Sequence, residues 1–135
     1  MTRSIRAMTT GICLLALAAP LAAHHSFTNF WNLDEMREIE GVVKAVKLVN
    51  PHCEIILEVT EANGQKFDYI IASQGTGTAI LRGGWSYDTL PVGTKVTVRG
   101  SPPRRPDGKA LIAGLIIRED GQEFSFGGIG GIPAG

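Results

Sequence analysis

The stretch Cys53–Ala72, CEIILEVTEANGQKFDYIIA, decides the fold class of this chain. Its first part, Cys53–Thr60, alternates between two faces in the way that is typical of a half-buried β-strand, and Lys66–Ala72 repeats the alternation. Between them, Asn63-Gly64 predicts a two-residue type I′ turn, because that turn needs a positive φ at both central positions. The stretch therefore predicts a β-hairpin, whose core face carries Cys53, Ile55, Leu57, Val59, Phe67, Tyr69 and Ile71.

A longer strand precedes this hairpin. Arg37–Val49 is rich in β-branched residues, and Gly41 interrupts it at a point where a bulge or bend would let the strand curve. Asn50-Pro51 ends the strand, since proline restricts its own φ and the conformation of the residue before it.

Three further elements follow the hairpin. Ala79–Arg82 is long enough for one or two helical turns, while Thr94–Arg99 and Lys109–Ile117 have the composition of strands. Three strands, a short helix and two strands, with a bent first strand, is the order of an OB-fold. We therefore predict an all-β domain with small helical content over residues 37–124, built as a five-stranded OB-like barrel. A small β-sandwich would have a similar periodicity.

The first 23 residues have the three-part pattern of a secretory signal. Arg3 and Arg6 supply positive charge, Ala7–Ala19 is apolar, and small residues lead up to Ala23. The apolar run is shorter than the roughly 20 residues that span a bilayer. We expect a signal-peptide helix within residues 1–23, cleavage after Ala23, and a periplasmic or secreted protein without stable membrane insertion. A retained membrane anchor is the alternative.

Two segments flank the predicted barrel. Residues 24–36 form a polar and aromatic N-terminal arm, in which Phe27, Phe30 and Trp31 are expected to pack on the domain. Residues 125–135 form a glycine-rich tail that we expect to be disordered. Cys53 is the one cysteine left after cleavage, so the mature chain has no intramolecular disulfide.

Composition excludes several classes of function. The 135 residues include 13 Lys+Arg and 13 Asp+Glu, and cleavage after Ala23 leaves 112 residues with 11 basic and 13 acidic side chains. A mildly acidic single domain is a poor binder of nucleic acid, whose phosphates select an excess of Lys and Arg. No nucleophile with an acid–base partner stands out, so we expect no enzymatic activity. The glycine-rich run 75–78 lacks the lysine of a phosphate-binding loop.

Several short motifs together resemble a known family. They are His24-His25-Ser26-Phe27 after the signal, Gly41-Val42-Val43, Asn50-Pro51-His52, Gly84-Trp85, and Gly93–Val98 followed by Gly100. With them the chain resembles the small exported bacterial proteins of the family called domain of unknown function 6152, over most of residues 15–123. The resemblance implies export and a compact β domain, but it implies no reaction.

All three histidines are candidate metal ligands. Cleavage after Ala23 would give His24 a free α-amine, and an N-terminal histidine can chelate a metal through that amine and its ring. His25 or His52 could supply a third nitrogen. A nitrogen-rich set suits Cu(II), ahead of zinc, and its ligands are available as neutral groups near neutral pH. On the predicted strand His52 faces outward and Cys53 faces the core, so Cys53 is a small buried apolar residue rather than a ligand.

Other interpretations remain open at this stage. The histidines could be ordinary polar and turn residues without a metal. A second hypothesis is a non-enzymatic OB-like interaction module that holds an envelope protein or ligand on its barrel face, its Trp85 loop and its Arg104-Arg105 loop. A copper-dependent redox enzyme is a third. The physiological ligand, the partner and the oligomeric state do not follow from the sequence.

Overall fold

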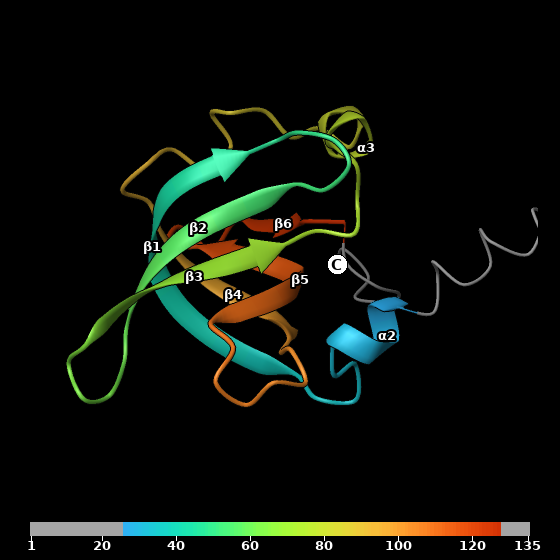
Figure 1. The fold of residues 1–135 in the computed structure, drawn as a ribbon. Helices are drawn as coiled ribbons and strands as arrows, with labels where there is room; N and C mark the ends of the chain where they lie inside the picture. Colours follow the sequence, from blue (N-terminus) through green and yellow to red (C-terminus); the bar gives the residue numbers. More distant parts are fainter. Residues whose placement is uncertain (1–25, 128–135) are drawn as a thin grey trace, which may run out of the picture. The chain divides into compact units, whose positions relative to one another are not determined.

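The computed structural model describes residues 26–127 of the chain (Figure 1). Two compact units are distinguished, residues 1–30 and 31–135, and of the first only the short helix α2 (Ser26–Phe30) is described. The predicted signal peptide, His24, His25 and residues 128–135 of the tail lie outside the described residues. Within residues 26–127 no helix is long and apolar enough to cross a membrane.

The second unit is a closed β-barrel. Its elements are β1 (Arg37–Lys47), β2 (Glu54–Thr60), β3 (Lys66–Ala72), α3 (Gly77–Arg82), β4 (Lys95–Ser101), β5 (Ala110–Arg118) and β6 (Glu123–Ser125). The strand order is β3-β2-β1-β4-β5-β6, and a parallel pairing of β3 with β5 closes the first five strands into a barrel. The predicted OB-like barrel is therefore confirmed, and β6 extends it as a short edge strand on β5.

Strand β1 belongs to both halves of the barrel. Residues Arg37–Val42 pair with β4, residues Val42–Lys47 pair with β2, and the register shifts between Val43 and Ala45. Gly41 lies just before this bulge. A Cβ atom added to Gly41 would be 2.9 Å from the carbonyl oxygen of Glu58 in β2. The register shift confirms the predicted irregularity near Gly41. Glycine is needed at position 41 because a side chain there would leave no room for β2.

The core contains most of the face that alternation predicted, but Phe67 and Tyr69 of that face are only half-buried. Cys53, Ile55 and Leu57 of β2 and its lead-in are buried in a core cluster to which β1, β3, β4 and β5 also contribute, and Phe124 of β6 packs against this cluster. Helix α3 begins at the N-cap Thr76, whose side chain accepts a hydrogen bond from the Ala79 amide. It buries Ile80 in this core.

The hairpin turn differs from the type I′ prediction. Gly64 has φ +81°, but no residue other than glycine has a positive φ in the described chain, so Asn63 does not adopt the conformation that a type I′ turn requires. The Gly64 amide instead donates to the Glu61 carbonyl, and the Glu61 amide donates to Gln65. A longer loop places the left-handed conformation on glycine alone, which avoids the steric cost at asparagine.

Both flanking segments contain structure that periodicity did not predict. In the arm, Ser26–Phe30 is helical. Of the aromatic residues expected to pack on the domain, Trp31 is buried and bridges to Pro103 in the loop after β4, whereas Phe30 is 55% exposed. At the other end, the ordered chain continues beyond the predicted boundary at residue 124. Ser125 pairs with Leu115, and Phe126 is fully buried.

Candidate functional site

The loop between β1 and β2 carries His52. The imidazole is exposed, whereas the neighbouring Cys53 side chain is fully buried. The Cys53 thiol lies 3.7 Å from the Val49 carbonyl oxygen, and burial raises the pKa of this thiol. A buried, protonated thiol is a poor metal ligand, so the structure agrees with the prediction that Cys53 belongs to the core.

The predicted metal ligands are not brought together by the described part of the chain. No group of three or more His, Cys, Asp or Glu side chains within residues 26–127 is arranged to hold a metal ion. His24 and His25 lie outside those residues, so His52 is the one predicted ligand whose surroundings are described. The site of His24, His25 and His52 stays a prediction.

Trp85 belongs to the core rather than to a binding loop. Its ring is 7% exposed, its Nε1 donates to the Ser125 carbonyl oxygen at 2.8 Å, and it packs on Phe124 and Phe126 with ring centroids 5.7 and 4.9 Å apart. The structure agrees with the expectation that Trp85 is a packing residue rather than a platform for a ligand. Arg105, by contrast, is exposed, with its guanidinium 3.6 Å from Asp107.

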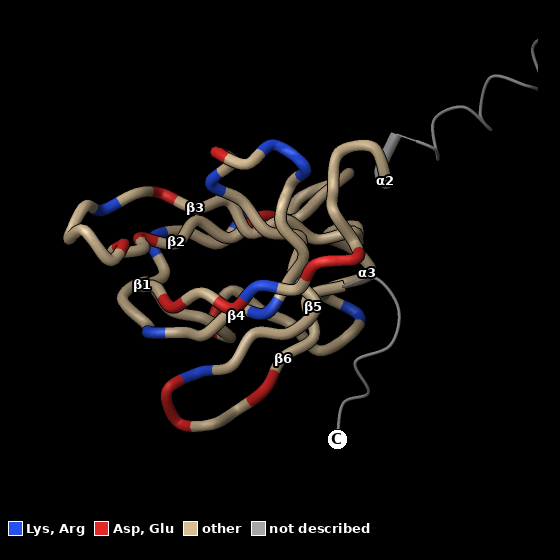
Figure 2. Tube along the Cα trace, turned by 90° about the horizontal axis from the view of Figure 1, so that it is seen from below, with Lys and Arg blue, Asp and Glu red and all other residues tan. Residues whose placement is uncertain are grey.

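The outer face of β1, β2 and β3 carries a ladder of ion pairs. Cross-strand pairs join Lys47 to Glu54 at 3.4 Å, Lys44 to Asp68 at 2.8 Å, and Lys66 to Glu58 at 2.7 Å. Figure 2 shows basic and acidic residues interspersed along the trace in the same way. Opposite charges cancel on this face, so these side chains offer no excess of cations to a polyanion.

A second cluster of side chains, formed by Glu61, Phe67, Tyr69 and Lys109, lies at the β2–β3 hairpin. This hairpin extends away from the barrel in Figure 1. The Lys109 ammonium lies 4.3 Å from the centre of the Phe67 ring and forms an ion pair with Glu61. The Tyr69 hydroxyl donates to the same carboxylate at 3.0 Å. The Lys109 hydrogen bond, and then that of Tyr69, hold the pKa of Glu61 below its usual range, although desolvation opposes them.

This cluster predicts a pH dependence of stability that Glu61→Gln should remove. Because the folded-state pKa of Glu61 is lowered, its stabilising contribution is present above the unfolded pKa of about 4.3 and is lost as the pH falls through the folded value. The difference in Tm between wild type and variant should therefore shrink between neutral pH and pH 2, as measured by circular dichroism. Glu123→Gln, at an exposed position without an ion pair in the described residues, is the control. A difference that stays constant with pH would contradict the assignment.

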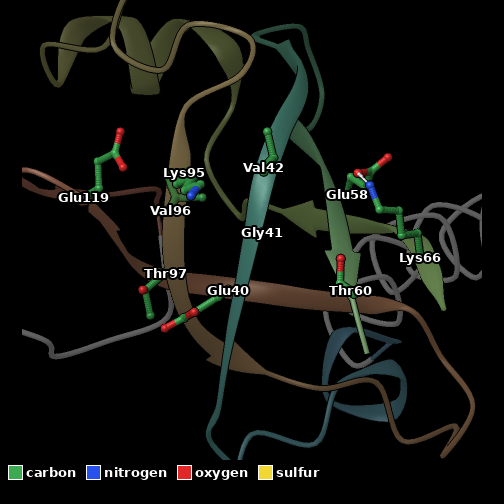
Figure 3. Close-up of a pocket in the computed structure, with 10 residues that line it drawn as sticks. All are labelled: Glu40, Gly41, Val42, Glu58, Thr60, Lys66, Lys95, Val96, Thr97 and Glu119. Atoms are coloured by element: carbon green, nitrogen blue, oxygen red, sulfur yellow. Dashed lines mark hydrogen bonds and ion pairs between the residues drawn. The ribbon is translucent and has the colours of Figure 1, made fainter. Parts of the chain in front are cut away.

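A groove crosses the outer surface where β1 bends (Figure 3). It has a volume of about 530 Å³, and the Gly41 backbone lies at its centre between β4 on one side and β2 on the other. Its lining is polar and charged around the apolar Val42 and Val96. The remaining lining residues are Glu40, Glu58, Thr60, Lys66, Lys95, Thr97 and Glu119.

The charges of this groove are only partly satisfied within the protein. Glu58 and Lys66 pair with each other across one wall, as the dashed line in Figure 3 marks. Glu40, Lys95 and Glu119 have no ion pair or hydrogen bond from their side chains among the described residues. Sequence reasoning missed this site, because its residues come from separate strands and share no motif.

Comparison with known proteins identifies a family. Residues 12–112 match the family of unknown function DUF6152, which covers most of the chain. The chain belongs to this family. No curated protein and no solved structure gives a significant match to this DUF6152 member.

The motifs that carried the resemblance have clear places in the DUF6152 barrel. Gly41 occupies the close approach of β1 to β2, and Asn50-Pro51, a cis peptide, precedes the exposed His52. Gly84, at φ +96°, leads into the buried Trp85. Gly100 lies against the β5 backbone. The glycines of these motifs allow close strand contacts or a positive φ, and Trp85 packs in the core. Among the motif residues named here, His52 is the one with an exposed side chain that can ligate a metal.

Proposed function

We propose that this DUF6152 member is an exported, non-catalytic domain that binds a transition metal, preferentially Cu(II), through its mature N-terminus. The α-amine and ring of His24 form the chelate, and His25 or His52 supplies a third nitrogen. The observation that supports the proposal is the exposed position of His52, on a loop rather than in the core. Cu(II) lies at the top of the divalent affinity series and accepts a tetragonal set of nitrogen ligands.

The free amine of His24 is the decisive element, and a Cu(II) titration tests it. Mature protein, with His24 verified as its first residue by mass spectrometry, is titrated under EPR and calorimetry. We expect one-to-one binding with a nitrogen-rich spectrum, because amine and imidazole both ligate as neutral groups near pH 7 to 8. His52→Ala and His25→Ala then show which histidine is the third ligand, since removing it changes the EPR parameters.

The control is the same protein with its N-terminal amine selectively acetylated. Acetylation keeps every side chain and removes the amine ligand, so the affinity should fall about 100-fold or more, because losing a direct ligand should cost at least as much as the roughly 10–100-fold lost with a partner that only supports a ligand. A chain lengthened by one residue is a poorer control, because it creates a new amine-to-histidine spacing. Equal Cu(II) affinity in the free and the acetylated forms would refute the N-terminal chelate.

A second candidate function is an interaction module that captures a ligand from the cell envelope. The groove at the bend of β1 favours it, since it combines an open surface with charges that have no partner among residues 26–127. On the Trp85 loop the Trp85 ring itself lies in the core, and Tyr87 is the exposed aromatic residue.

A further inference from the structure

We infer that Asn63, in the loop of the β2–β3 hairpin, is a site of spontaneous covalent modification, at which the side-chain amide is hydrolysed to a carboxylate after ring closure onto the Gly64 nitrogen. This inference is independent of metal binding and of the interaction module. Three observations carry it: the residue that follows Asn63, the open space around Gly64, and a hydrogen bond to the carbonyl oxygen of the amide that is attacked.

The reaction needs only the two residues and water. Solvent base removes the proton of the Gly64 amide, and the nitrogen forms a bond to Cγ of Asn63. The bond from Cγ to Nδ2 then breaks, and Nδ2 leaves as ammonia with a proton from water. Water opens the resulting cyclic imide at either carbonyl carbon, which gives aspartate or isoaspartate. The net reaction consumes one water and releases one ammonia, and nothing is oxidised or reduced.

The residue that follows distinguishes Asn63 from the other asparagines, which are chemically labile residues in general. The four pairs in the chain are Asn29-Phe30, Asn32-Leu33, Asn50-Pro51 and Asn63-Gly64. Proline has no amide proton to lose, and the Cβ atom of phenylalanine or leucine crowds the attacking nitrogen. Glycine has no Cβ atom, so the nitrogen after Asn63 is the least hindered of the four.

Solvent reaches the loop around Asn63. The loop lies at the end of the hairpin, which extends away from the barrel in Figure 1, and both Asn63 and Gly64 are exposed. Apart from the chain neighbours of Gly64, no atom lies within 4 Å of the position that a Cβ atom on this residue would occupy. Base and water can therefore approach the Gly64 nitrogen and, later, the imide.

The loop also activates the carbonyl group of the Asn63 side chain. The Gln65 amide donates to Oδ1 of Asn63 at 2.9 Å. Ring closure places negative charge on this oxygen, and a main-chain N–H that already points at it stabilises that charge. The Nδ2 of Asn63 donates to Oε1 of Gln65 at 3.0 Å, so both ends of the amide are held by the same residue.

One hydrogen bond of the loop opposes the reaction. The Gly64 amide donates to the Glu61 carbonyl oxygen at 2.8 Å, and this bond must open before the nitrogen can lose its proton and attack. Opening one hydrogen bond should slow the conversion about fivefold relative to an unstructured peptide of the same sequence. The loop therefore slows the conversion of Asn63 without preventing it.

The two products differ in their effect on the loop. Aspartate leaves the main chain unchanged, and its carboxylate can still accept the hydrogen bond from the Gln65 amide. Isoaspartate carries the main chain through the former side chain and lengthens it by one carbon atom. The hydrogen bond from the Glu61 amide to the Gln65 carbonyl, 2.8 Å long, closes this loop and should be lost in the isoaspartate form.

Incubation of the folded mature protein in oxygen-18 water at mildly alkaline pH tests the inference. The water that opens the imide puts heavy oxygen into the new carboxylate. Peptide mass spectrometry with electron-transfer fragmentation assigns this label to a residue and distinguishes isoaspartate from aspartate. We expect label at Asn63 before Asn29 or Asn32, at a rate about fivefold below that of an acetylated, amidated peptide of residues 60–67. In this peptide, Gly64→Ala should slow the conversion about tenfold or more, because the Cβ atom crowds the nitrogen.

Asn63→Gln is the matched variant in the protein. It keeps an amide at position 63, but its longer side chain must close a larger and less favourable ring, so label at this position should fall about tenfold or more. Circular dichroism verifies that the variant is folded. No label at Asn63 after about ten half-times of the peptide reaction would overturn the inference, since a fivefold slower reaction would then be well advanced. Earlier label at another asparagine, or equal label at position 63 in the wild type and in Asn63→Gln, would overturn it as well.

Discussion

Phe126→Ala is expected to lower the free energy of unfolding by about 3–5 kcal/mol, the range for truncating a fully buried aromatic residue. Phe126 is 0% exposed, and its ring centroid lies 4.9 Å from that of Trp85. The substitution removes apolar contact area and leaves a cavity beside Trp85, which relaxation of a closed barrel fills only in part. Urea denaturation, followed by tryptophan fluorescence and circular dichroism, measures the loss.

Tyr87→Ala is the matched control for this prediction. Tyr87 is also aromatic and lies close to Trp85 in sequence, but it is 60% exposed. Its truncation should change the free energy of unfolding by no more than about 0.5 kcal/mol, as is usual for a surface position. If Phe126→Ala costs no more than Tyr87→Ala, then Phe126 is not part of the cooperative core and the domain ends before residue 126.

Gly100→Ala should also destabilise the barrel strongly, by about 3 kcal/mol, the upper part of the usual range for overpacking. A Cβ atom at position 100 would lie 2.4 Å from the carbonyl oxygen of Ile112 and 3.1 Å from the Cα atom of Ala113. Both are backbone atoms of β5, so no side chain can rotate away. Strands β4 and β5 must separate at this point, and urea denaturation reports the cost.

Gly83→Ala is the corresponding control. At position 83 the φ angle is −75°, and the nearest atom to an added Cβ would be the Ile80 carbonyl oxygen at 3.3 Å. This substitution should be nearly neutral, because it also reduces the entropy of the unfolded chain. Equal effects at positions 83 and 100 would mean that the close approach of β4 to β5 relaxes freely.

The candidate metal site was predictable only in part. The alternation Cys53, Ile55, Leu57 was enough to place His52 in solvent and Cys53 in the core, because side chains along a strand alternate between two environments. The sequence also favoured a packing role for Trp85 over a surface role, but it could not name the partners of the ring. A tryptophan after two glycines looks like a loop residue, and its burial depends on Phe124 and Phe126 from the end of the chain.

The groove could not be predicted from any single segment. Glu40, Glu119 and Lys95 are unremarkable residues of separate strands or strand ends, and they come together only through the register of β1 with β4 and the divergence of β1 from β2. Register and divergence are long-range properties. The hydrophobic pattern fixes which side chains of each strand face the core, but which outward-facing residues of different strands meet depends on how all the strands close the barrel.

By itself the sequence determined the kind and order of the five barrel strands and of helix α3, since apolar alternation and the positions of glycine and proline act within a few residues. That order was sufficient for an OB-like barrel. The tertiary structure alone decided how the barrel closes, through the parallel pairing of β3 with β5, and how far the core extends, through Phe126. It also decided where charges remain unpaired. The physical reason is that burial and pairing energies depend on contacts between residues far apart in the chain, and these exist only once the barrel has formed.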